Sequence, residues 1–253
     1  MAESLSLCII TRDAAGELAE CVESARFADD IVVVDSGSRD DTVEVARRLG
    51  ARVLEHPFTG FGAQKQFAVA AARHDWVLCL DADERVTPEL AAGIAQVLAR
   101  DNPGAAAFAL ARRNRFLGRW LNHGEGYPDW NVRLFDRRYA RWSDDVVHER
   151  VIVDGHAARV DGDLLHASAE SLADYIAKQN RYTSLQAEAM HREGRTAGFA
   201  LIALAPLARF VRLYFFRLGF LDGSAGFAHI AVGAFGSFLK YAKLRALGVG
   251  DAE

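Results

Sequence analysis

The sequence predicts an α/β protein in which helices flank a mixed, mainly parallel β-sheet. Over residues 1–100, short apolar runs of strand length alternate with segments of helical periodicity, and this alternation is typical of layered α/β folds. The run Ile31–Val34 is β-branched, as is common in parallel strands that are buried on both faces. Ligands of such sheets bind beyond the carboxyl ends of the strands. We therefore expect the ligand site among Thr11, Asp35 and Asp81, which lie at these ends.

Each element of the first part has its own signal. We expect strands at 5–11, 31–34, 52–54 and 76–80, and helices at 13–26, 42–49 and 61–72. Gly50 ends the second helix, because glycine commonly follows the last helical turn. Thr87 and Pro88 open a further helix, since a capping threonine and a first-turn proline favour a helix start.

After residue 107 the sequence pattern of the chain changes twice. Residues 108–163 carry short alternating runs, many Arg and Trp residues and several turns, and we interpret them as the mixed half of the sheet. Residues 171–193 predict a long helix with a polar face. Two apolar segments follow at 197–219 and 224–247. The chain is therefore expected to end in a helical extension.

This extension is both apolar and basic. Residues 196–253 include six Lys or Arg and three acidic residues, a net charge of +3, whereas the whole chain carries −4. Arginines interrupt the first apolar segment, and the uncharged stretch 223–239 in the second has only 17 residues, so both fall short of a transmembrane span. Basic apolar helices favour contact with an anionic membrane surface. Packing against the rest of the chain or in a dimer interface is the alternative.

The composition of the chain limits the class of protein to which it can belong. With 253 residues, of which 51% are hydrophobic and 25% charged, the chain can bury a sizeable core and has the composition of a folded protein. The net charge of −4 argues against a general nucleic-acid binder, which is usually basic. Cys8, Cys21 and Cys79 show no metal-ligand spacing and suit a reducing compartment. The N-terminus lacks the pattern of a signal peptide, so we expect a cytoplasmic protein.

The most informative motif is Asp81-Ala82-Asp83, which directly follows the apolar run 76–80. Two carboxylates one residue apart at the end of a buried strand can hold a hard divalent cation, and such a cation can carry a diphosphate. The pair alone is a weak signal, because many soluble proteins contain one by chance. The order of strands and helices before it is what favours nucleotide-sugar chemistry.

The second expected strand ends in Asp35-Ser36-Gly37-Ser38. Asp35 can accept hydrogen bonds from a base or a ribose, and Gly37 permits a tight turn; a well-capped turn without a ligand is the alternative. The chain lacks both the Gly-x-Gly-x-x-Gly and the Gly-x-x-x-x-Gly-Lys loops, which argues against a dinucleotide oxidoreductase and a P-loop phosphotransferase. Phosphates bound here would need a metal and cationic side chains. Lys65 either supplies one such charge or is a solvated surface lysine.

Together these motifs resemble the family-two glycosyltransferases of the Rossmann-like GT-A fold. The resemblance rests on Thr11, the stretch 34–42, Gly62-x-Gln64-Lys65 and the stretch 76–84. The later stretches 147–149, 165–166 and 220–226 resemble a bacterial subgroup that includes the lipopolysaccharide core glycosyltransferases. The match covers nearly the whole chain. It implies a GT-A catalytic domain at 1–170, with a nucleotide-sugar half at 1–100 and an acceptor half at 101–170, and a membrane-associating helical extension at 171–253.

The resemblance also assigns roles in donor binding. The implied nucleotide-sugar site comprises Thr11, Arg12, Asp35, Gly37, Ser38, Lys65, Asp81 and Ala82. Many family members have Asn at the position of Arg12. Asp83, together with Asp81, would hold Mg²⁺ or Mn²⁺ on the diphosphate. His166 ends a short apolar run and either completes the metal shell or has a structural role.

An inverting transferase needs a general base that deprotonates the acceptor hydroxyl as it attacks the anomeric carbon opposite the leaving diphosphate. Segment 144–149 supplies the candidates, although the Glu-Asp pair that often holds the base in family two is not present. We expect Glu149 to be the base, because its His-Glu pair occupies the corresponding segment in the subgroup, with Asp145 as the second candidate. Six arginines either meet a phosphorylated or acidic acceptor or form a solvated charged face: Arg112, Arg113, Arg115, Arg133, Arg137 and Arg138.

The sequence thus predicts a metal-dependent inverting glycosyltransferase that moves a hexose, expected to be glucose, from a UDP-sugar to a lipid-linked or lipopolysaccharide-type glycan. Its expected place is the inner face of the cell membrane, as a peripheral protein without a nucleic-acid partner. A sugar nucleotidyltransferase is the second hypothesis, but residues 11–16 do not supply the Gly-rich cationic loop that it needs. A non-catalytic domain that binds a nucleotide sugar or glycan is the third, and the acidic residues at 81, 83 and 149 argue against it.

Overall fold

The computed structural model describes residues 3–100, 103–143, 145, 149–167 and 171–250. The chain divides into two compact units, one formed by residues 1–112 with 129–167 and the other by residues 113–128 with 168–253. Residues 113–128 therefore group with the C-terminal helices, although they are far from them in the sequence. Each unit contains its own buried hydrophobic cluster.

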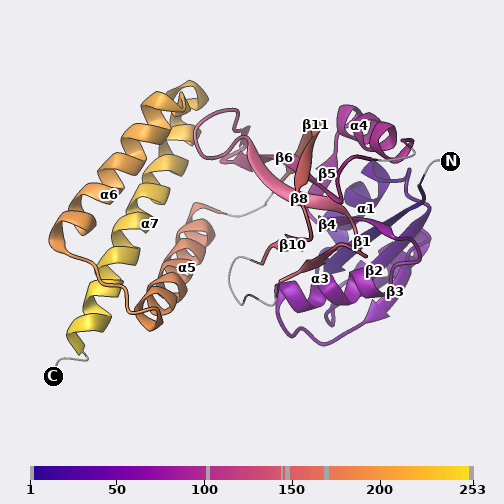
Figure 1. Cartoon of the computed structure of the whole chain (residues 1–253), viewed down its shortest axis with the longest axis horizontal. Helices are drawn as coiled ribbons and strands as arrows, with labels where there is room; N and C mark the ends of the chain where they lie inside the picture. Colours follow the sequence, from indigo (N-terminus) through magenta and orange to yellow (C-terminus); the bar gives the residue numbers. More distant parts are fainter. Residues whose placement is uncertain (1–2, 101–102, 144, 146–148, 168–170, 251–253) are drawn as a thin grey trace. The chain divides into compact units, whose positions relative to one another are not determined.

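The first unit is built on a mixed sheet with the strand order β3-β2-β1-β4-β8-β6-β11-β5 (Figure 1). Its parallel part consists of β1 (Leu5–Thr11), β2 (Asp30–Asp35), β3 (Arg52–Glu55) and β4 (Trp76–Asp81). Its other strands are β5 (Glu84–Val86), β6 (Ala107–Phe116), β8 (Asp129–Asp136) and β11 (Ala157–His166). β8 runs antiparallel to both β4 and β6, and β11 runs antiparallel to β5. The predicted mixed, mainly parallel sheet is thus confirmed.

Helices cover both faces of this sheet because successive side chains of the central strands point to opposite sides. On one face, residues of β1 and β4 pack with α1 (Ala15–Ser24), α2 (Thr42–Arg48) and α4 (Pro88–Leu98). On the other face, Cys8 and Cys79 pack with α3 (Phe61–Ala70). The short pair β9 (Ala140–Trp142) and β10 (Val151–Val153) also contributes to this second face.

Two glycines allow α4 to approach β11 closely. A Cβ atom at Gly93 would lie 2.7 Å from Cγ1 of Val160, and a Cβ at Gly162 would lie 2.3 Å from the backbone nitrogen of Leu90. Gly162 also has a φ of 101°, a conformation that side chains rarely adopt. This contact positions β11, the strand that ends in His166.

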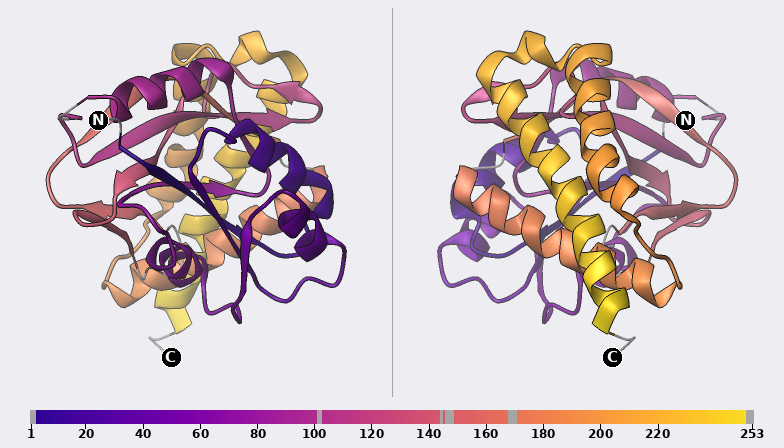
Figure 2. Two further views of the ribbon diagram at one scale, coloured as in Figure 1. Left: turned by 90° about the vertical axis from the view of Figure 1, so that its right-hand side faces the viewer. Right: turned by 90° about the vertical axis from the view of Figure 1, so that its left-hand side faces the viewer.

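The second unit consists of helices and one short hairpin. Its helices are α5 (Leu172–Arg192), α6 (Phe199–Val211), the π-helical turn η1 (Arg212–Phe216), the 3₁₀ turn η2 (Gly219–Asp222) and α7 (Gly223–Gly250). α7 lies between α5 and α6, as the views of Figure 2 show, and packs against both. The hairpin joins the end of β6 to β7 (Arg119–Trp120).

One helical segment among the described residues, Phe199–Phe216, is long and apolar enough to cross a membrane by length and composition alone. By length and composition α6 with η1 thus passes a test that the arginines of the first apolar segment were expected to make it fail. Only 6% of the segment is buried within the molecule. Several of its large apolar side chains are exposed, namely Phe199, Leu201, Leu204, Leu207, Val211, Phe215 and Phe216.

We expect Gly162→Ala to lower the free energy of unfolding by about 3 kcal/mol, because the new methyl group collides with the backbone of α4 and also strains a left-handed residue. Chemical denaturation followed by circular dichroism measures this change. Gly155→Ala is the matched control, since Gly155 has a φ of 118° but open space around its Cα. That variant is expected to lose only about 1 kcal/mol from backbone strain. An equal decrease in the free energy of unfolding in both variants would show that the close contact with α4 does not contribute to stability.

Candidate functional site

The carboxyl ends of three parallel strands lie side by side in the first unit. Thr11 pairs with Asp35, and Ile10 pairs with Asp81, in the register of the sheet. The Thr11 hydroxyl is buried and has no hydrogen-bond partner within the described part of the chain. An unpartnered buried hydroxyl is energetically costly. This strand end therefore suits a ligand that supplies the missing hydrogen bond.

Asp35 organises the turn that follows β2. Its Oδ2 accepts hydrogen bonds from the backbone N–H groups of Gly37 and Ser38, both at 2.9 Å, and its Oδ1 accepts one from the Ser38 hydroxyl. Gly37 has a φ of 86°, which favours glycine. The three residues therefore form one rigid turn. Arg12 is exposed on the neighbouring loop after β1, and contact of these residues with a nucleoside stays a prediction.

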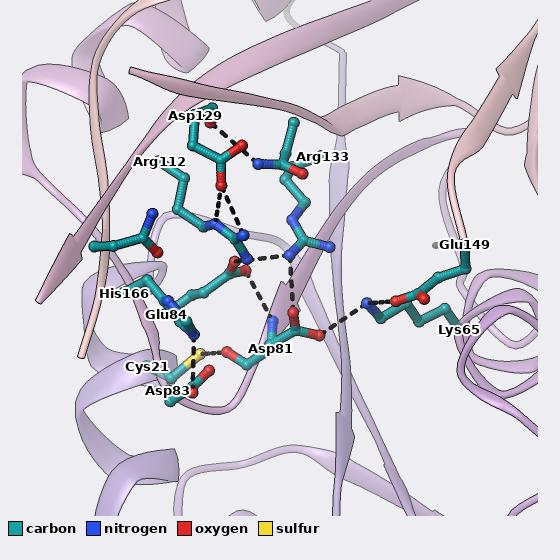
Figure 3. A network of polar contacts seen from close by, with 12 residues as sticks. Cys21, Lys65, Asp81, Asp83, Glu84, Arg112, Asp129, Arg133, Glu149 and His166 are labelled. Atoms are coloured by element: carbon teal, nitrogen blue, oxygen red, sulfur yellow. Dashed lines mark hydrogen bonds and ion pairs between the residues drawn. The ribbon is translucent and has the colours of Figure 1, made fainter. Parts of the chain in front are cut away.

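A buried cluster of charges lies at the end of β4 (Figure 3). The side chain of Glu84 is fully buried; one of its oxygens accepts a hydrogen bond from Arg133 at 2.7 Å, and the other accepts one from the backbone N–H of Asp81 at 3.0 Å. Nη2 of Arg133 also donates to Oδ2 of Asp81 at 2.8 Å. Burial lowers the pKa of Arg133, but Glu84 and Asp81 outweigh this effect and raise it above the usual value. The guanidinium therefore stays charged although it is buried.

Arg112 extends this cluster toward the edge of the sheet. Its Nη2 donates to Asp129 at 2.7 Å, and its Nη1 lies 3.5 Å from Glu84. Both Arg112 and Arg133 thus form ion pairs with acidic residues of the same unit. For Arg133, whose side chain is almost completely buried, the alternative of a solvated charged face is wrong.

Lys65 of α3 contacts Asp81 from another side. Its Nζ lies 3.1 Å from Oδ1 of Asp81 and 2.9 Å from Oε1 of Glu149, above the ring of Trp142. The Lys65 side chain is only 6% exposed, so the alternative of a solvated surface lysine is wrong. Burial raises the pKa of Asp81, but Arg133 and Lys65 outweigh burial and hold it well below its usual value. Asp81 is therefore ionised, with a cation against each of its oxygens.

Gly62 allows the segment that carries Glu149 to come close to α3. A Cβ atom at Gly62 would lie 2.1 Å from the carbonyl oxygen of Ser143 and 3.4 Å from Cβ of Glu149. The structure thus brings the expected base next to Lys65 and, through it, to Asp81.

The second candidate for the base, Asp145, lies elsewhere. Its side chain is about half exposed, and its nearest cation is Arg150, at 3.9 Å. Residues 144 and 146–148, which complete the predicted base segment, lie outside the described residues.

Asp83 has a different partner from Asp81. β5 pairs with β11 so that Glu84 lies opposite His166, and Nε2 of His166 lies 3.1 Å from Oδ2 of Asp83. Burial raises the pKa of Asp83, but its hydrogen bond with His166 and the histidine charge outweigh burial and lower it. Ala82 lies in the turn between the two aspartates. The two carboxylates of the motif are therefore held by different groups.

The donor set fits a divalent cation that takes most of its ligands from a substrate. Within the described residues, no three His, Cys, Asp or Glu side chains form a group that could hold a metal. Asp83 and His166 supply two adjacent ligand groups, each partly exposed. Mg²⁺ in proteins is often bound by one or two carboxylates with substrate phosphates and water. Asp83 and His166 are thus the residues that would hold such an ion.

Glu84 had no separate role among the sequence predictions. Arg133 was expected either to meet the acceptor or to lie on a solvated face, although its position offered a signal for burial. Arg133 stands between Val132 and Leu134 in a strand, and a charge inside an apolar strand requires a buried partner. The identity of that partner, which is 49 residues away in the chain, could not be read from the pattern.

Comparison with known proteins adds independent evidence. Residues 6–153 match the family model described as glycosyl transferase family 2. The lipopolysaccharide core biosynthesis glycosyltransferase LpsC of Rhizobium meliloti (strain 1021) is 30% identical over 247 residues, which cover 95% of this chain and 91% of LpsC. An uncharacterized glycosyltransferase of Rickettsia felis is 30% identical over 257 residues, which cover 96% of this chain and 90% of the relative.

A solved structure supports the fold. The mannosyltransferase PcManGT from Pyrobaculum calidifontis, in complex with GDP-Man and Mn²⁺, matches with a TM-score of 0.55 at 16% identity, covering 100% of this chain and 88% of that protein. This likeness shows that the chain has a GT-A-like fold. The family model covers more than half of the 253 residues, and LpsC aligns along nearly the whole chain. The chain is therefore a glycosyltransferase that belongs to family 2 and resembles the transferases of the lipopolysaccharide core.

Proposed function

We propose that this glycosyltransferase moves one hexose from a nucleotide-diphospho-sugar, expected to be UDP-glucose, to a membrane-anchored glycan of the lipopolysaccharide-core type with inversion at the anomeric carbon. The observation that carries this proposal is that the two aspartates of the Asp81-Ala82-Asp83 motif have different partners. Asp81 is held by Arg133 and Lys65, whereas Asp83 lies beside His166. One carboxylate is thus structural, and the other is available for a metal–diphosphate.

The donor would bind across the carboxyl ends of the parallel strands. The unpartnered hydroxyl of Thr11 and the turn held by Asp35 support a nucleoside site beside β1 and β2. Asp83 and His166 would hold Mg²⁺ or Mn²⁺, in keeping with the Mn²⁺ and GDP-Man in the PcManGT complex. A bound divalent cation stabilises the negative charge of the leaving diphosphate.

Glu149 is the residue we propose as general base. In the reaction the acceptor oxygen forms a bond to the anomeric carbon while the bond from this carbon to the diphosphate oxygen breaks. The proton of the acceptor hydroxyl would pass to a carboxylate oxygen of Glu149. Lys65 positions this carboxylate, because its Nζ bridges Glu149 and Asp81 at 2.9 and 3.1 Å.

The proposed acceptor is inferred from the relative LpsC and not from the geometry of the candidate site. LpsC is named for lipopolysaccharide core biosynthesis, and a lipid-linked core glycan is built at a membrane. The apolar, basic helices after residue 170 support a peripheral location on the inner face of the cell membrane. We accordingly propose a catalytic domain at 1–170, whose halves 1–100 and 101–170 bind donor and acceptor, and an extension at 171–253 that associates with the membrane.

We expect Asp83→Asn to lower metal-dependent release of nucleotide from the donor by at least about a hundredfold, since removal of a ligand weakens metal binding and transition-state stabilisation. The purified protein would be assayed with a panel of UDP- and GDP-hexoses and Mg²⁺, Mn²⁺ or EDTA. Calorimetric titration of nucleotide with and without Mn²⁺ gives a second readout that does not depend on turnover.

Asp161→Asn is the matched control, because Asp161 is an exposed carboxylate on the same strand as His166. It should retain both turnover and metal-dependent binding. Undiminished turnover in the Asp83 variant would contradict the proposed metal site. Wild-type protein that neither hydrolyses any donor nor binds nucleotide in a metal-dependent way would contradict the proposed function.

Glu149→Gln is expected to lower kcat by about 10²–10⁴-fold, the usual contribution of a general base, while donor binding persists. Asp145→Asn is the comparison and should stay close to wild type. Steady-state kinetics with a core-glycan acceptor measures kcat, and fluorescence titration measures donor affinity. The reverse pattern, with the loss in the Asp145 variant, would assign the base to Asp145 instead.

A further inference from the structure

We propose that the second unit carries a docking surface for an anionic phospholipid membrane, centred on a cluster of exposed apolar residues that we call the tip. The tip consists of Leu117, Phe215, Phe216, Leu218, Phe220 and Leu221. It deepens the proposed function, because a surface of this kind would bring the enzyme to a lipid-linked acceptor. The inference depends only on contacts within the second unit.

Two loops that are distant in the sequence form the tip together. Nη2 of Arg119, in the hairpin after β6, donates to the carbonyl oxygen of Leu221 at 3.2 Å. The N–H of Gly124 donates to the carbonyl oxygen of Arg217 at 2.9 Å. Asp222 is buried and accepts hydrogen bonds from the backbone of Asn122 and His123 at 2.9 and 2.8 Å. These contacts fix the hairpin against η1 and η2, so the tip is a built surface.

The tip exposes large apolar side chains to an unusual extent. Phe216 is 80% exposed, Phe215 is 55% exposed, and the other four members of the tip are between 43% and 52% exposed. Leu204, Leu207 and Val211 of α6 are also exposed, and their spacing continues the Phe215 face along the helix. Large exposed apolar side chains gathered on neighbouring turns mark an interaction site.

Two leucines of the tip occupy backbone conformations that disfavour them. Leu117 and Gly118 form the two-residue connection between Phe116 and Arg119 with φ values of 47° and 77°, as in a type I′ turn, which favours Asn-Gly. Leu218 has a φ of 55°, where Gly or Asn is preferred. Neither side chain gains burial in return, since both remain about half exposed. Such strain at an exposed apolar residue indicates that the side chain serves a contact outside the folded unit.

The charged residues around the tip indicate which kind of partner it binds. Arg115, Arg119, Arg212 and Arg217 are all exposed, and residues 113–124 and 196–221 contain no acidic residue. The neighbouring Asp222 is buried and engaged by the hairpin. Arginines beside protruding Phe and Leu side chains match an anionic lipid surface, with guanidinium groups at the headgroups and apolar side chains in the acyl region.

The same charges favour a surface contact over a transmembrane span for α6 and η1. Arg209 lies within the apolar segment and bonds to Ser237 and Glu125 of its own unit, and Arg212 follows one turn later. An arginine near the centre of a membrane-spanning helix costs about 2.5–3.5 kcal/mol. A helix that lies along the interface avoids this cost, because Arg209 keeps its partners within the unit and the exposed Arg212 remains at the headgroups.

The test compares vesicle binding of the full-length wild type with that of the double variant L117N/L218N. Asparagine suits both left-handed positions, so the variant should fold at least as stably as the wild type, which circular dichroism and thermal unfolding verify. We expect wild-type protein to co-sediment with equimolar phosphatidylcholine–phosphatidylglycerol vesicles and to bind phosphatidylcholine vesicles much more weakly. Each leucine removed should weaken binding to the mixed vesicles by about tenfold.

Two further variants sharpen the result. F58N removes an aromatic residue of the first unit that is 48% exposed, and it should bind vesicles like the wild type. R212Q/R217Q should lose the preference for anionic vesicles. Unchanged vesicle binding in L117N/L218N, or equal losses in F58N, would overturn the proposal.

A second copy of the chain is the competing occupant of the tip. Sedimentation velocity without lipid distinguishes the two: a wild-type dimer that L117N/L218N converts to monomer, without change in vesicle binding, would overturn the membrane assignment. Donor hydrolysis without lipid should be unaffected by L117N/L218N. Failure of hydrolysis in the wild type would count against the proposed function, whereas loss of vesicle binding alone concerns only the tip.

Discussion

A single buried guanidinium, that of Arg133, connects three strands at the point where the candidate site begins. It extends from β8 and donates to Asp81 at the end of β4 and to Glu84 at the start of β5. Burial of three charges is costly, and removal of one partner from such a cluster usually costs several kcal/mol because the others are left unpaired. The turn that carries Asp83 lies between Asp81 and Glu84. Its position therefore depends on this cluster.

The cluster separates the roles of the two aspartates of the motif. Arg133 and Lys65 hold Asp81 ionised and in place, whereas Asp83 projects beside His166 at the end of β11. The same Lys65 also reaches Glu149, so one ammonium group links the strand end to the proposed base. In the proposed reaction Asp83 would hold the metal–diphosphate, and Glu149 would accept the proton of the acceptor hydroxyl.

Much of the fold follows from local patterns. The strands β1 to β4 and the helices between them appear where apolar periodicity placed them, and Thr87 caps α4 as predicted by accepting from the N–H of Leu90. The pairing of Glu84 with Arg133 could not be predicted, because side chains 49 residues apart meet only once the strand order is known. The same holds for the grouping of residues 113–128 with the C-terminal helices. The left-handed conformations of Leu117 and Leu218 could not be predicted from local sequence either, because leucine is not a typical residue for such a turn.

In the proposed reaction Asp83 and His166, and not Asp81, hold the metal on the donor diphosphate. A crystal structure of the enzyme with Mn²⁺ and UDP, with the metal located by anomalous scattering, tests this directly. We expect a manganese peak within coordination distance of Asp83 and His166, with the diphosphate completing the shell and Asp81 still held by Arg133 and Lys65. A peak coordinated by Asp81, with Arg133 and Lys65 displaced from it, would show that Asp81 is the metal ligand instead.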